Sequence, residues 1–356
     1  MSLDYLYNLQ VQQFAQQLYA TNLLIPQIQP LNEVWQYYNP HARYNRLNVA
    51  YENMVHHAVQ KVFLCLASGK GSEEWGYVDK SAWKKTCKTG KSQSPIDLDI
   101  SQAILVDWEP LKFHNYDARG DIVAENNGHT ELVQGFQSWT KRPYVTGGNL
   151  KGRYNLQQFH FHWDGNDRFG SEHTLAGLHY PLEVHFVHIK EGLNETNAHH
   201  VVGGVAVVAV QFQIAPKGEA LFDLEKVTEA TNSSDTKGDV PSYSPGSLLP
   251  PDTSTFFRYT GSLTTPPCSE GVIWTILAYP NLVTDTQLRI LRRHLKEDGS
   301  LLIDNWRTVQ PMNGRKLYLN KGTVNREGID TGELWDITSK AVPVVLICVV
   351  FIVVLV

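Results

Sequence analysis

The chain has 356 residues, enough for one large domain or two smaller ones. Its 42% apolar and 11% aromatic residues are typical of a folded core, and its net charge of −5 is spread over both signs. The absence of a basic stripe and of aromatic platforms among Lys and Arg argues against nucleic acid as a partner.

Two segments precede the motif-bearing part of the chain. Residues 1–53 are rich in Gln and Tyr, which predicts an extension that is disordered or loosely helical. Residues 54–69 contain a methionine, a lysine, a short apolar run and small residues, a pattern typical of a secretory signal peptide. A natural start at Met54 is a hypothesis that would explain its internal position.

The stretch Gln158–Trp163 predicts a strand with two imidazoles on one face. Side chains of a strand alternate faces, so His160 and His162 point to the same side as Gln158. The three aromatic residues between and after them point to the other side. The two histidines are therefore close enough to share one small cation.

A second alternating stretch, Leu182–His188, places Glu183 and His185 on one face. If the two strands pair antiparallel, His185 completes a set of three imidazoles. A single histidine in a strand more often packs or faces solvent, but this combination on two apolar strands favours a metal site.

Three neutral imidazoles suit a tetrahedral Zn²⁺ that keeps its fourth position open. A metal-bound histidine usually gives its other N–H to an acceptor. Gln158 and Glu183 lie two residues before His160 and His185, so we expect them to be these acceptors.

Other segments have recognisable local patterns. We expect a strand at Val201–Phe212, a helix at Ala215–Thr231, a polar loop at Asn232–Pro251, a proline-rich loop at Leu263–Pro267 and a helix at Asp285–Leu295.

The last sixteen residues, 341–356, are continuously apolar. This run is slightly shorter than the roughly twenty residues that span a bilayer. A short transmembrane helix and the tail of a GPI-attachment signal both remain open, with a buried core helix as the alternative. We expect membrane attachment.

Several ordered motifs resemble those of α-class carbonic anhydrases, over nearly three quarters of the chain, from about Trp75 to about Leu334. The motifs are Gln158–Trp163, Gly170–Thr174, Leu182–His188 and Gly261–Pro267. The resemblance implies that His160, His162 and His185 bind zinc, and that the carbonyl of Asn305 supports His162.

The resemblance also implies roles for three catalytic residues. His129 would carry protons between the metal site and solvent, for which an ordinary pKa near 6.5 is suitable. Glu172 would accept the hydroxyl proton of Thr264, which orients the attacking group. Asn127 would order the intervening water, whereas Leu132 stands where many active members carry an amide.

The remaining implied residues contact substrate or stabilise the domain. Carbon dioxide and bicarbonate would lie against Val187, Val207, Leu263, Thr264, Thr265 and Trp274. From the residues alone Cys87 and Cys268 could be free thiols; extracellular members of the family imply that they form a disulfide. Asn194 and Asn232 begin glycosylation sequons in polar loops.

The resemblance implies one α+β, mainly β domain, residues 74–335, with a large twisted, mostly antiparallel sheet of about ten strands and peripheral helices. The expected function is zinc-dependent hydration of carbon dioxide at the extracellular face of a membrane. An acatalytic binding or adhesion module of the same fold is the alternative, and the sequence does not indicate an oligomeric state.

Overall fold

A computed structural model describes residues 75–77, 83 and 85–321. The predictions for residues 1–53, 54–69 and 341–356 concern parts of the chain outside these residues. Within the described residues, no helix is both long enough and apolar enough to cross a bilayer.

In the described part of the chain, a 13-stranded sheet contains nearly all the strands, and a separate two-stranded sheet pairs β1 with β8. The main path runs β11-β4-β5-β7-β9-β10-β13-β12-β15-β2, with β14 beside β10 and with β6 between β3 and β7. The strands are β1 (Asp97–Leu98), β2 (Ile104–Val106), β3 (Leu111–His114), β4 (Gly120–Asn126), β5 (Glu131–Gln134), β6 (Tyr144–Gly147), β7 (Tyr154–Trp163), β8 (Thr174–Leu175), β9 (Leu182–Lys190), β10 (Val205–Ile214), β11 (Thr236–Tyr243), β12 (Phe256–Ser262), β13 (Glu270–Leu277), β14 (Asn281–Val283) and β15 (Tyr318–Asn320).

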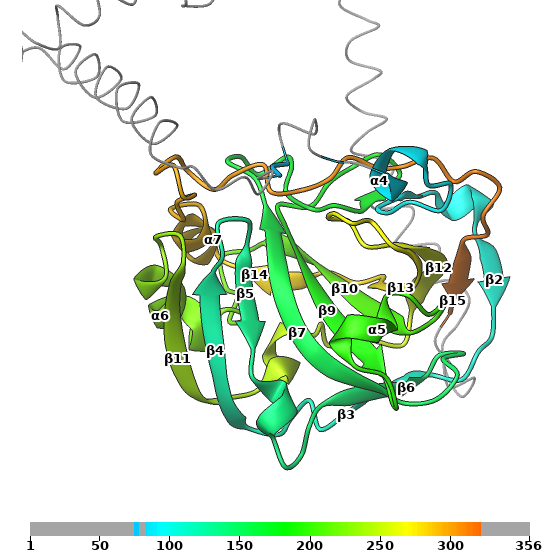
Figure 1. Cartoon of the computed structure of the whole chain (residues 1–356), viewed down its shortest axis with the longest axis horizontal. Helices are drawn as coiled ribbons and strands as arrows, with labels where there is room; N and C mark the ends of the chain where they lie inside the picture. The colour runs from blue at the N-terminus through cyan, green and yellow to red at the C-terminus, as the bar shows by residue number, and fades with distance from the viewer. Residues whose placement is uncertain (1–74, 78–82, 84, 322–356) are drawn as a thin grey trace, which may run out of the picture. The chain divides into compact units, whose positions relative to one another are not determined.

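Among the described residues, the helices are short and lie around the sheet (Figure 1). In this part of the chain the α-helices are α4 (Thr86–Thr89), α5 (Glu195–Ala198), α6 (Glu225–Ala230) and α7 (Asp285–Leu291), and the 3₁₀ turns are η2 (Ile100–Gln102), η3 (Phe136–Ser138), η4 (Phe222–Leu224) and η5 (Pro245–Leu248). Most neighbouring strands are antiparallel; β10 pairs parallel with β13 and β14, and β15 with β2. The predicted mainly β fold is therefore confirmed.

The central strands have an apolar core on each face, because their side chains alternate. In β10, Val208 and Val210 join the core that contains Phe159 and Phe161 of β7. Val207 belongs instead to the second core, with Ala209 and Trp274. Figure 1 shows β7, β9 and β10 side by side in the middle of the sheet.

Two predicted helices and one predicted strand are too long. The helix expected at Ala215–Thr231 is confined to η4 and α6. The residues before them run close to β14, where a Cβ on Gly218 would lie 2.8 Å from the Leu282 backbone. The helix expected at Asp285–Leu295 stops at Leu291, because Leu295 instead bridges to Leu301.

The strand expected from Val201 starts only at Val205, after a turn in which Gly203 has a φ of 72°. The polar loop expected at Asn232–Pro251 is also wrong, because it contains β11 and η5. Strand β11 lies at one end of the main path and, among the described strands, pairs only with β4; an edge position tolerates its Pro241. Pairing with β4 stabilises this polar segment as a strand.

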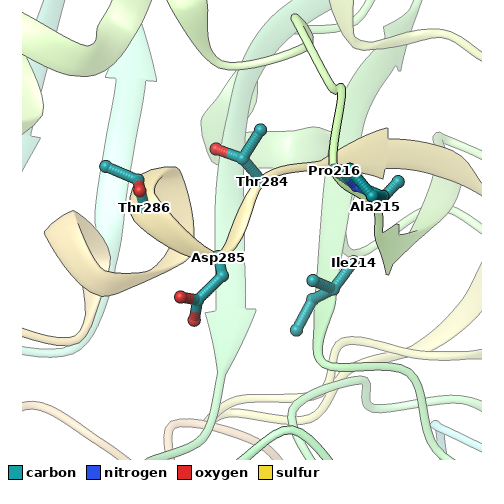
Figure 2. Close-up of a pocket in the computed structure, with 6 residues that line it drawn as sticks. All are labelled: Ile214, Ala215, Pro216, Thr284, Asp285 and Thr286. Carbon is teal, nitrogen blue, oxygen red and sulfur yellow. The ribbon is translucent and has the colours of Figure 1, made fainter.

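An open pocket lies where β10 ends and α7 begins. Its lining residues are Ile214, Ala215, Pro216, Thr284, Asp285 and Thr286 (Figure 2). None of the candidate site residues lines it, so the predicted chemistry lies elsewhere.

Candidate metal centre

The register of β7 against β9 brings the three histidines together. The strands pair antiparallel, with His160 directly opposite His185 and His162 opposite Glu183. The ring centroid of His185 lies 5.3 Å from that of His160 and 4.4 Å from that of His162. The conditional prediction of three clustered imidazoles is confirmed.

One nitrogen of each ring is held by an acceptor. The Nδ1 of His160 lies 2.9 Å from Gln158 Oε1, and the Nε2 of His185 lies 2.6 Å from Glu183 Oε1. The Nδ1–H of His162 donates to the carbonyl oxygen of Asn305 at 2.8 Å. These contacts leave Nε2 of His160, Nε2 of His162 and Nδ1 of His185 available to bind a metal ion.

The available nitrogens converge. One nitrogen from each ring can be chosen so that all lie within 4.8 Å of one another, and His162 Nε2 is 3.0 Å from His185 Nδ1. Burial lowers the pKa of His160 well below its ordinary value, and the neighbouring rings lower it further. Burial also lowers the pKa of His162. Neutral imidazoles with facing lone pairs are the form that binds a divalent cation.

Glu183 connects the metal centre to a buried network. Its Oε1 is also 2.7 Å from His173 Nδ1, and its Oε2 accepts from the His173 backbone N–H. Burial alone would raise the pKa of Glu183, but His173 and His185 hold it well below its usual range. The carboxylate therefore stays charged and fixes the His185 ring.

The network behind Glu183 was not predicted from the sequence. The His173 ring reaches the hydroxyl of Tyr259 at 2.8 Å, and that hydroxyl donates to Ser94 Oγ. Ser94 lies in the segment Gln93–Ile96, whose residues give no sign of this contact. The separation of 165 residues along the chain hides it from local patterns.

Glu172 lies buried beside the imidazoles. Its Oε1 accepts from the backbone N–H of Arg307 at 2.8 Å and lies 3.6 Å from His162 Nδ1. Its Oε2 is buried and has no hydrogen-bond partner among the described residues. The predicted hydrogen bond from Thr264 to Glu172 is therefore not formed in the structure, although the buried Thr264 occupies a loop as predicted.

His129 follows a tight turn and is half-buried. Its ring stacks on Trp75, with centroids 4.1 Å apart and planes 7° apart. Burial lowers its pKa, and the charge of Lys296 lowers it further. The Oδ1 of Asn127 accepts from the backbone N–H groups of His129 and Thr130, so this oxygen fixes the turn.

The predicted substrate wall lies in the second core. Val187 and Val207 are direct cross-strand partners, and Val207 also pairs with Trp274. Leu263 packs against this core, and the loop continues through Thr265. In addition, Leu132 is the cross-strand partner of His160, which places an apolar side chain beside the metal centre.

The predicted disulfide is present between Cys87 and Cys268, 181 residues apart. Cys87 belongs to α4, and the backbone N–H of Cys268 donates to the carbonyl oxygen of Thr265. The disulfide therefore connects α4 to the loop that carries Thr264.

With this geometry in place, a family model described as eukaryotic-type carbonic anhydrase matches residues 70–321. The chain belongs to the eukaryotic-type carbonic anhydrase family. The chemistry of carbonic anhydrases is the reversible hydration of carbon dioxide, and membership supports that general assignment, with carbon dioxide and bicarbonate as its small molecules.

Curated carbonic anhydrases cover most of the chain. "Putative carbonic anhydrase 5" of Caenorhabditis elegans is 38% identical over 282 residues, 74% of this chain and 88% of the relative. "Putative carbonic anhydrase 3" of the same organism is 39% identical, over 68% of this chain and 96% of the relative. Human "Carbonic anhydrase 7" is 35% identical, over 69% of this chain and 96% of the relative.

Proposed function

We propose that the chain catalyses the zinc-dependent reversible hydration of carbon dioxide to bicarbonate and a proton, at the extracellular face of a membrane. The observation that carries the proposal is the convergence of nitrogens from His160, His162 and His185, with the other nitrogen of each ring held by an acceptor.

The residues present fit zinc. Three buried or half-buried imidazoles form a neutral nitrogen donor set, which suits Zn²⁺ with one open position. Bound there, zinc would lower the pKa of a water molecule to about 7, the value established for carbonic anhydrase. The acceptors Gln158, Glu183 and Asn305 would fix the tautomer of each ring.

Two side chains would orient the attacking oxygen. The Oε2 of Glu172 is buried without a partner among the described residues, so it is an acceptor that still needs a hydrogen bond. We assign this hydrogen bond to the Thr264 hydroxyl in the complex with substrate. That hydroxyl would donate to Glu172 and would itself accept a hydrogen bond from the attacking group. Thr265 would border the same position.

Carbon dioxide is apolar, so a dry wall suits it. Val187, Val207, Leu263 and Trp274 supply that wall, and bicarbonate would leave it readily because its charge is poorly solvated there. His129 would then transfer the proton to solvent, since an imidazole exchanges protons near neutral pH.

The extracellular membrane location is part of the proposal. The disulfide between Cys87 and Cys268 favours an oxidising compartment. Asn194 and Asn232 are exposed, as glycosylation would require. The apolar segment 341–356 would supply attachment by a transmembrane helix or a GPI anchor.

Stopped-flow CO₂ hydration by the purified full-length chain tests the proposed activity. We expect hydration that a chelator abolishes and that added zinc restores. A chain with zinc at full occupancy and no hydration would contradict the proposal and would favour the acatalytic binding module.

A further inference from the structure

A buried carboxylate lies two residues beyond His129. Glu131 begins β5 and is 1% exposed. Its Oε2 is 2.8 Å from His294 Nε2, and its Oε1 accepts from the Thr231 hydroxyl at 2.9 Å. A carboxylate without such partners would be costly to bury. These hydrogen bonds therefore hold the start of β5 against His294 and Thr231.

The cross-strand partner of Glu131 contacts the same two segments. Asn126 ends β4 opposite Glu131 and is fully buried. Its Nδ2 donates to the carbonyl oxygens of Asn232 at 3.2 Å and Leu295 at 3.0 Å. These residues directly follow Thr231 and His294, the partners of Glu131.

The two contacted segments are themselves joined, because the Leu295 N–H donates to the Asn232 carbonyl oxygen at 2.7 Å. We call Glu131, Asn126, Thr231 and His294 the hairpin clamp. It attaches both strands, where they adjoin the β4–β5 turn, to the joined segments around Asn232 and Leu295.

The turn carried by this hairpin contains His129. Asn126 Oδ1 accepts from the Gly128 N–H at 3.0 Å, and the Asn127 N–H donates to the Thr130 carbonyl oxygen. The Asn305 side chain donates to the His129 carbonyl oxygen at 3.1 Å. The position of the His129 main chain therefore depends on the clamp.

The clamp also connects to the metal-binding strand. The His294 ring packs edge-on against Trp163, with centroids 5.7 Å apart, and Trp163 follows His162 in β7. The Leu302 N–H donates to the His294 carbonyl oxygen, and the Trp163 ring N–H donates to the Leu302 carbonyl oxygen. The turn that carries His129 and the strand that carries His162 are thus both connected to the segment around His294.

We propose that Glu131, held by His294 and Thr231, is a positioning residue for His129 and sets the efficiency of proton transfer to solvent. It contacts neither the three imidazoles nor the substrate wall in the structure. The inference rests on the proposed function, in which His129 moves the proton.

The test compares full-length wild type with Glu131→Leu, Glu131→Gln, Thr231→Val and His129→Ala in CO₂ hydration at low and high imidazole concentration. We expect Glu131→Leu to lower kcat at low imidazole by about tenfold, since a displacement of roughly 1 Å can cost up to 100-fold. His129→Ala should lower it at least as much. Added imidazole should restore both, with kcat/KM unchanged, because a diffusible base replaces the displaced ring.

Two variants separate positioning from folding. Glu131→Gln keeps hydrogen-bonding atoms and should retain most of the wild-type kcat. Thr231→Val removes one bond with little change in volume, so it tests the clamp even if Glu131→Leu does not fold. Thr228→Val is a buried change in α6, the helix that Thr231 caps, and the Thr228 side chain makes no hydrogen bond to Glu131; it is the matched control and should match wild type.

The outcomes distinguish this inference from the function on which it rests. Wild type without hydration would overturn both. If wild type is active, and both Thr231→Val and Glu131→Leu hydrate carbon dioxide as fast as wild type at low imidazole, only the positioning role of Glu131 is overturned. A loss that imidazole does not restore, or a fall in kcat/KM, would also overturn it, since that result indicates damage to the metal site. A crystal structure of Thr231→Val should show the His129 main chain displaced; an unchanged turn would contradict the clamp.

Discussion

His160 of β7 and His185 of β9 lie directly opposite each other across an antiparallel strand pair. A shift of one residue in this pairing would turn His185 to the other face of the sheet. The metal centre therefore depends on strand register as much as on the identity of the side chains, and the apolar residues on both faces fix that register.

Replacing His185 by alanine should abolish zinc binding. Two imidazoles would remain, and the acceptor Glu183 would lose its contact with the ring. We expect zinc content, measured by plasma emission spectroscopy, to fall from one per chain to a small fraction. His200→Ala changes an exposed histidine and should keep full occupancy. Full zinc content in His185→Ala would rule out this ligand set.

The acceptor behind His160 should contribute to metal affinity. In Gln158→Ala the Nδ1 of that ring loses its partner at 2.9 Å. We expect zinc to bind about 10- to 100-fold more weakly in competition with a chelator of known affinity. Gln157→Ala removes the adjacent amide, which contacts Arg142 and Glu195 instead, and should bind like wild type. Equal affinities for the two variants would contradict a supporting role for Gln158.

These interactions show how far the sequence predicts the site. The alternation of His160, His162 and His185 with apolar residues predicts strands, shared faces and two of the three acceptors, because period-two patterns report directly on side-chain direction. The third acceptor, the Asn305 carbonyl, came only from the family resemblance.

Features that depend on distant packing could not be predicted. Strand β11 has a polar, proline-containing sequence that reads as a loop, and only its pairing with β4 makes it a strand. Glu131 and His294 form a buried pair although 163 residues separate them in the chain. Either residue, considered alone, is of a type that is common at protein surfaces. Neither segment carries a local signal of its distant partner.

Removing the disulfide should destabilise the domain. Cys87→Ser combined with Cys268→Ser frees a loop of 181 residues in the unfolded chain. We expect the free energy of unfolding to fall by about 2–5 kcal/mol in chemical denaturation. Wild type measured under reducing conditions provides the comparison and should fall by a similar amount. No difference between oxidised and reduced wild type would contradict a stabilising role.

His188 should make stability depend on pH. Burial lowers its pKa from the ordinary value of 6.5 to about 4. The unfolded chain therefore binds this proton first as the pH falls, and stability should decrease from pH 6.5 to pH 4 by about 3 kcal/mol. Well above pH 6.5 this ring is neutral in both states, and its contribution to stability is constant.

Denaturation at a series of pH values measures this effect. His188→Gln should make the decrease less steep, whatever its effect at neutral pH, because this titrating ring is gone while the buried His160 and His162 remain. His200→Ala, at an exposed position, should keep the wild-type slope. An equal slope in His188→Gln would show that other groups cause the pH dependence.

Anomalous diffraction at the zinc edge, from crystals of the full-length chain grown with zinc, tests the central claim most directly. We predict one strong peak bonded to His160 Nε2, His162 Nε2 and His185 Nδ1, at about 2.0–2.1 Å from each nitrogen. No peak there, or a zinc ion bound elsewhere while these three nitrogens stay uncoordinated, would contradict the account.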